Sequence, residues 1–168
     1  EKTVKKFYAQ GFRAFKVKIG CDEDIDLQRI LAVKKHAPRS RIYLDANQAY
    51  TAAQTIKFLE QLRQFKIIPD LIEQPVKKND WEGLKKLSKT LRIPVCADES
   101  ASSLLYVRRI IKEKCACAIN IKLMKFGIFE AQEAALLAKK NNLRLMIGGM
   151  MESSLAMTAA AHLAAGLG

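Results

Sequence analysis

The sequence lacks the features that mark several classes of protein. Its 168 residues contain no apolar run close to the length of a membrane-spanning helix, which needs roughly 20 residues. The first ten residues, EKTVKKFYAQ, lack the apolar core of a signal peptide, so we expect a cytoplasmic protein without a membrane partner. The four cysteines fit a reducing compartment, and the spacing of Cys115 and Cys117 is not that of a metal site. We expect the cysteines to serve in packing.

Positive charge is abundant, but its distribution does not indicate a nucleic-acid-binding surface. The formal net charge is +12, and lysines occur in every helical pattern except residues 153–165, at positions where an amphipathic helix shows its solvent face. The sequence has no zinc-finger spacing, no aromatic-rich strand of the RNA-recognition type and few aromatic residues for base stacking. We therefore favour a solvated basic surface and expect no nucleic-acid partner; nucleic-acid binding is kept only as a third alternative for the function.

Short β-rich segments alternate with helical patterns along the whole chain. Strands are predicted at residues 14–20, 41–47, 70–75, 94–100, 118–123 and 144–149. Helices are predicted at residues 2–10, 22–36, 51–65, 80–91, 102–114, 127–141 and 153–165. This alternation predicts an α/β fold, with a parallel sheet and right-handed crossover helices outside it. No linker or low-complexity stretch divides the chain, so residues 1–168 are expected to form one domain or part of one.

The spacing of the strands favours a (β/α) barrel. Between corresponding strand ends, from Lys18 through Asp45, Glu73 and Asp98 to Lys122, the intervals are 27, 28, 25 and 24 residues. A barrel of eight units spends about 30 residues on each. The alternative, a doubly wound open sheet, usually has a glycine-rich phosphate loop after its first strand, and KIGCDEDIDL does not supply one. The barrel is therefore the predicted fold, although six strands are visible where a barrel needs eight.

Charged residues stand at or near the carboxyl ends of the predicted strands, where the loops of a parallel barrel build its active site. Three carboxylates brought together there repel one another unless a cation lies between them, and hard oxygen ligands suit Mg²⁺. Helix capping could explain any one of these acids, but it is a strained explanation for the whole set. The candidate metal ligands are Asp45, Glu73 and Asp98.

Lysines accompany these acids. Lys16 and Lys18 point to the same face of their strand, because side chains alternate along it. A second ammonium group and a divalent cation nearby lower the pKa of a lysine, which can then take up a proton near neutral pH. Lys122 is expected to face this pair from the opposite side. We reject Lys125 for that role, because three residues along an extended strand it points the other way.

Six motifs carry a resemblance to a known family. KVK (16–18), DAN (45–47), EQP (73–75), ADES (97–100), NIKLMK (120–125) and GGMMES (148–153) resemble the enolase superfamily, in its muconate-lactonizing subgroup, and most closely the dipeptide epimerases. The resemblance covers nearly the whole chain. It implies a modified (β/α)₇β TIM-like barrel, truncated here to the family's second to seventh strands and without the capping domain.

The resemblance also implies a mechanism and its residues. A proton is abstracted from the carbon α to a carboxylate, and Mg²⁺ holds the oxygens of the resulting enediolate. The implied substrate is a small carboxylate, a dipeptide of the Ala-Glu type, which is epimerized. The implied roles are metal binding by Asp45, Glu73 and Asp98, acid/base catalysis on opposite faces by Lys18 and Lys122, electrostatic stabilisation by Lys16, and substrate binding by Asn47 and Glu152.

Several alternatives stay open. Muconate cycloisomerase and o-succinylbenzoate synthase reuse the same metal and lysines. The mandelate-racemase branch is disfavoured, because Lys122 stands where that branch has an aspartate, and His36 and His162 lie in predicted helices. One departure from the family is Ile128, where a second glycine is common. A non-enzymatic alternative is an inactive truncated barrel whose open edges pair with another copy, and for the same reason we expect a homo-oligomer.

Overall fold

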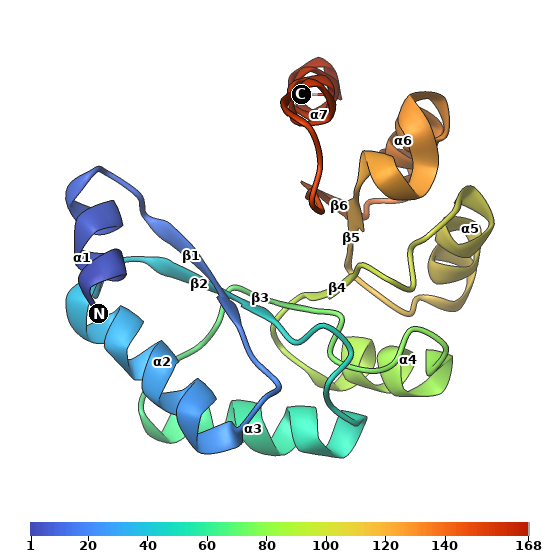
Figure 1. Ribbon diagram of the computed structural model, residues 1–168. Helices are drawn as coiled ribbons and strands as arrows, with labels where there is room; N and C mark the ends of the chain where they lie inside the picture. The colour runs from blue at the N-terminus through green and yellow to red at the C-terminus, as the bar shows by residue number, and fades with distance from the viewer. Residues whose placement is uncertain (168) are drawn as a thin grey trace.

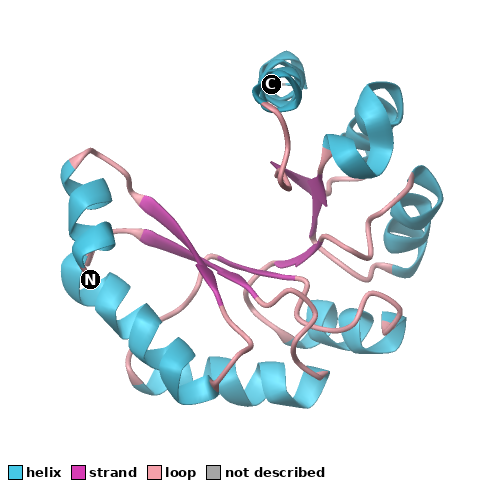
Figure 2. Ribbon diagram, viewed as in Figure 1, coloured by secondary structure: helices cyan, strands magenta, loops and turns pink. Residues whose placement is uncertain are grey.

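The computed structural model describes residues 1–167 and shows six parallel strands with helices along their outer side (Figures 1 and 2). The strands are β1 (Ala14–Lys18), β2 (Arg41–Asp45), β3 (Leu71–Glu73), β4 (Val95–Ala97), β5 (Ala118–Ile121) and β6 (Arg144–Ile147). The helices are α1 (Lys2–Ala9), α2 (Glu23–His36), α3 (Ala52–Gln64), α4 (Trp81–Thr90), α5 (Leu104–Glu113), α6 (Leu123–Lys140) and α7 (Ser154–Leu167). The predicted order of elements is confirmed.

The sheet follows the order of the chain from β1 to β6, and every neighbouring pair is parallel. In Figure 1 it curls, with the helices on its convex side and β1 well apart from β6. Within residues 1–167 no strand pairs with the outer edge of either. The predicted α/β barrel architecture is therefore confirmed as a curled half-barrel. No helix in this range is long and apolar enough to cross a membrane.

The two faces of the sheet differ in chemistry because side chains alternate along each strand. Leu44 and Ile72 lie in register on the face that packs against the helices, and both are fully buried. The next positions, Lys18, Asp45 and Glu73, are also in register and lie on the opposite, inner face. The apolar face supplies the core, so the inner face is free to carry charge.

The strands end sooner than predicted, because the chain turns sharply at their carboxyl ends. Asn47, Gln48 and Gln74 have positive φ angles of 44°, 69° and 34°, which end the extended conformation. Backbone bonds tie the turns together: Gln48 donates to the carbonyl of Gln74, and Gln74 to that of Cys96, each at 2.8 Å. The acids therefore stand where each strand gives way to its loop.

Helix α6 begins at Leu123, four residues before the predicted start. It is interrupted at Gly127, whose φ of 68° and ψ of −177° are not helical. The last part of the NIKLMK motif is therefore a short helical turn rather than an extended strand.

The cysteine prediction is half right. Cys96 and Cys115 are buried, as expected of packing residues, whereas Cys21 and Cys117 are exposed. All four are free thiols.

Candidate active site

The three predicted metal ligands are all buried at the carboxyl ends of neighbouring strands. Asp45 ends β2, Glu73 ends β3 and Asp98 follows β4 directly, and their exposed fractions are 3%, 0% and 2%. Three ionised carboxylates in such a place need compensating charge, since burying an unpaired charge is costly. Lysines from the neighbouring strands and loops supply it.

The lysine pair of β1 compensates the first two acids. Lys16 Nζ lies 3.2 Å from Asp45 Oδ2 and 2.6 Å from Glu73 Oε2, and Lys18 Nζ lies 2.8 Å from the same Asp45 oxygen. The prediction that both lysines point to one face is therefore confirmed. Asn120 completes the surroundings of Glu73, because its side-chain amide donates to Oε1 at 2.9 Å.

A second pair of lysines holds Asp98. Lys122 contacts Oδ2 at 2.5 Å and Lys125 contacts Oδ1 at 2.8 Å. The prediction that Lys125 points away from the site is wrong. Because β5 ends at Ile121 and α6 begins at Leu123, the two lysines are separated by about one helical turn, and residues at that spacing share a helix face.

Burial and ion pairing act in opposite directions on the pKa values of the charged groups in the site. Burial raises the pKa of Glu73, against the lowering effect of Lys16. Burial by itself lowers the pKa of Lys16, but the contacts with Glu73 and Asp45 outweigh it and the pKa is raised. The predicted lowering was for a lysine beside a divalent cation, and it stays a prediction. Burial also acts to raise the pKa of Asp98, but Lys125 and Lys122 outweigh it and hold that pKa below its usual value.

Gln74 is a part of the site that the sequence analysis did not single out. Its side chain is fully buried, and its Oε1 accepts hydrogen bonds from the backbone N–H groups of Asp98 at 2.9 Å and Ser100 at 3.0 Å. Its Nε2 donates to the Val76 carbonyl at 3.0 Å and to the Ser100 hydroxyl at 2.8 Å. The sequence feature that could have indicated its role is the uncharged amide side chain inside the EQP motif. Gln74 holds the loop that carries Asp98.

The remaining predicted residues have other contacts. Asn47 donates a hydrogen bond to Glu99, the residue that follows Asp98. Glu152 accepts one from the backbone of Met150 at 3.1 Å. The structure thus places Asn47 beside the acids and gives Glu152 a local contact in its own loop. His36 and His162 lie in α2 and α7, as predicted.

The acids fit a divalent cation in their chemistry. Among residues 1–167 no three Asp, Glu, His or Cys side chains lie close enough to hold a metal ion as they stand. However, all three acids offer hard oxygen ligands, and the ammonium of Lys16 already lies between Asp45 and Glu73. A positive charge is therefore accommodated between two of the three carboxylates.

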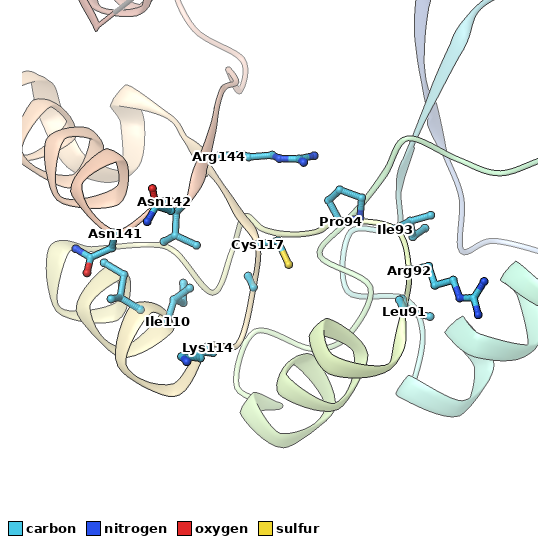
Figure 3. Close-up of a pocket in the computed structure, with 13 residues that line it drawn as sticks. Leu91, Arg92, Ile93, Pro94, Ile110, Lys114, Cys117, Asn141, Asn142 and Arg144 are labelled. Carbon is cyan, nitrogen blue, oxygen red and sulfur yellow. The ribbon is translucent and has the colours of Figure 1, made fainter.

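A hollow of about 560 Å³ lies at the other end of the strands (Figure 3). It is formed where the chain enters β4, β5 and β6, and Pro94, Cys117 and Arg144 are among its lining residues. None of the predicted site residues lines it. The candidate site is thus the charged cluster at the carboxyl ends and not this hollow.

Comparison with known proteins gives consistent results. The chain shares 50% identity over 168 residues with a hydrophobic dipeptide epimerase of Citrifermentans bemidjiense, covering 98% of this chain and 46% of that protein. A solved mandelate racemase/muconate lactonizing enzyme from Roseiflexus sp. superposes with a TM-score of 0.96 at 44% identity, covering 99% of this chain and 49% of that one.

A dipeptide epimerase from Enterococcus faecalis V583, solved with Mg and the dipeptide L-Leu-L-Tyr, superposes with a TM-score of 0.92 at 34% identity, covering 98% of this chain and 47% of that one. The chain thus spans about half the length of the relatives it matches. The family described as Enolase C-terminal domain-like matches residues 1–168. With this match over its whole length, the chain belongs to the enolase C-terminal domain-like family.

Proposed function

We propose that this chain carries the metal-binding and acid/base residues of a Mg²⁺-dependent dipeptide epimerase. One observation carries the proposal: lysines flank a row of three buried carboxylates on both sides. Lys16 and Lys18 contact the row from β1, and Lys122 contacts it from the far side, where β5 ends. Two basic groups on opposite sides of a bound carbon acid are what inversion of its configuration requires.

The relatives support the substrate class. Relatives named as dipeptide epimerases include the Citrifermentans protein, and the Enterococcus structure contains both Mg and a dipeptide. A small carboxylate of the dipeptide type is therefore the proposed substrate. Asn47 and Glu152, which follow β2 and β6, are proposed to contact it.

The proposed mechanism assigns a separate task to each lysine. Mg²⁺, held by Asp45, Glu73 and Asp98, would supply positive charge to stabilise negative charge that develops on the substrate carboxylate. Lys18 and Lys122 take and return the α-proton on opposite faces, so that removal on one side and return on the other inverts the centre. Lys16 adds fixed positive charge beside Asp45 and Glu73.

Exchange of the α-proton in heavy water tests this assignment in the complete protein. Lys18→Ala should keep exchange from one epimer of the dipeptide and Lys122→Ala from the other, while both lose epimerization. Lys16→Ala should slow exchange from both epimers, and Lys86→Ala, which changes an exposed lysine of α4, should leave it unchanged.

Equal loss of exchange from both epimers in both base variants would refute the two-base assignment. Turnover of a muconate or formation of o-succinylbenzoate, without epimerization of any dipeptide, would favour the alternative enzymes instead.

The open edges of the sheet favour a second candidate, a self-associating barrel without catalysis. Within residues 1–167 the outer edges of β1 and β6 pair with no strand, and such edges can pair with another copy of the chain. Light scattering coupled to gel filtration would show the resulting homo-oligomer. An oligomer that neither binds Mg²⁺ nor exchanges an α-proton would support this candidate over the enzyme.

A further inference from the structure

All the N–H donors of the Lys125 ammonium are satisfied by hydrogen bonds within the protein. A lysine ammonium has three N–H donors. Those of Lys125 reach the Asp98 carbonyl at 2.7 Å, Asp98 Oδ1 at 2.8 Å and the Asn120 carbonyl at 2.7 Å, and the side chain is 7% exposed. Within residues 1–167, the ammonium of Lys122 contacts Asp98 Oδ2 alone. Lys122 therefore has donors to spare for a substrate and Lys125 does not.

The three contacts of Lys125 connect two strands. Asp98 follows β4 and Asn120 belongs to β5, so one ammonium links the carboxyl ends of these neighbours. Since Lys125 occupies Oδ1, the other oxygen of Asp98 is the one that reaches Lys122. The side chain of Asn120 in turn donates to Glu73, so the same link extends to a second carboxylate of the site.

The backbone around Lys125 holds it in this place. The helical turn that carries it ends at Phe126, which is buried, and at Gly127, whose φ of 68° favours glycine. Beyond the break, Glu130 accepts a hydrogen bond at 2.6 Å from the backbone N–H of Leu104, at the start of α5. The turn is thus anchored by a buried ring on one side of the break and by a neighbouring helix on the other.

We infer that Lys125 is a positioning residue that holds the carboxylate of Asp98 in a single orientation. The inference rests on the proposed function for the identity of Asp98 as a Mg²⁺ ligand. It assigns different tasks to two lysines that are three residues apart: Lys122 faces the substrate, and Lys125 acts only through Asp98.

Magnesium titration by calorimetry tests the inference, because positioning and charge predict opposite results. If Lys125 acts only as a nearby positive charge, Lys125→Met should tighten Mg²⁺ binding by removing repulsion, and Lys125→Arg should leave it unchanged. If Lys125 positions Asp98, both variants should weaken binding by about tenfold or more, the usual effect of losing a group that orients a ligand. Arginine fails because its planar fork cannot replace a compact ammonium. Lys86→Met is the matched control.

A second measurement needs no metal. Lys125 links the loop of Asp98 to β5, so losing that link should loosen the loop and its amides. Hydrogen exchange followed by mass spectrometry should therefore show faster exchange at the amides of Asp98 and Ser100 in Lys125→Met and Lys125→Arg, and no change in Lys86→Met. If the unmodified protein binds no Mg²⁺, the metal assignment fails while the exchange result still decides the role of Lys125. If Lys125→Met does not fold, Lys125→Arg decides. Unchanged exchange in a folded variant, or unchanged or tighter Mg²⁺ binding, would overturn the inference.

Discussion

Replacing Gln74 by leucine is expected to cost a large share of the protein's stability. The side chain is fully buried, and its Oε1 is the acceptor for the backbone N–H groups of Asp98 and Ser100. Leucine has a similar volume but no acceptor, so both donors would be left buried without a partner. Each such donor costs about 1–3 kcal/mol, which gives about 2–6 kcal/mol for the two. Domains of this size are stable by about 5–15 kcal/mol in total.

Urea unfolding followed by circular dichroism measures this loss as a change in the free energy of unfolding. Gln64→Leu is the control, since Gln64 is exposed at the end of α3 and the same change of side chain there leaves no buried donor. The control should change the free energy by less than about 0.5 kcal/mol, as surface substitutions usually do. A loss below about 1 kcal/mol for Gln74→Leu would refute the view that its amide holds the loop of Asp98.

Two further predictions concern packing and thiol chemistry. Gly20→Ala should clearly lower the midpoint of thermal unfolding, because the added Cβ would lie 2.2 Å from the Cβ of Ala49 and the φ angle of Gly20 is +108°. Gly166→Ala is the control and should not lower the midpoint, because nothing lies within 4 Å of its new Cβ. Equal midpoints for the two variants would contradict the close packing around Gly20. At about pH 8 a thiol reagent should modify the exposed Cys21 much faster than the buried Cys115. Burial raises the pKa of Cys115 to about 11, so little of its thiol is in the reactive thiolate form. Equal rates of modification would show that Cys115 is accessible.

The parts of the site that follow from strand periodicity could be predicted from the sequence. A period of two places Lys16 and Lys18 on one face, and the interval between strands places Asp45 and Glu73 at matching strand ends. The structure has these residues in contact. Such predictions succeed because they require only the existence of each strand and its direction, and not its exact ends.

The parts that depend on an exact boundary could not be predicted. Whether Lys125 faces the site is decided by where β5 gives way to α6, and a shift of a few residues reverses the answer. The role of Gln74 depends on a loop that returns from a different strand, which no local pattern reveals. The raised pKa of Lys16 depends on two distances to carboxylates that only the folded chain sets.

The internal pairing of acids and lysines has a consequence for how this protein matures. Asp45, Glu73 and Asp98 each have a lysine partner from the chain itself, so their negative charge is balanced by the polypeptide before any ion arrives. In domains whose buried ligands have no such partners, folding waits for the metal. Under the proposed function, a newly made chain would therefore not need magnesium to reach its folded shape and would load the ion afterwards. The supply of magnesium would then affect the proposed catalysis more than the amount of folded protein.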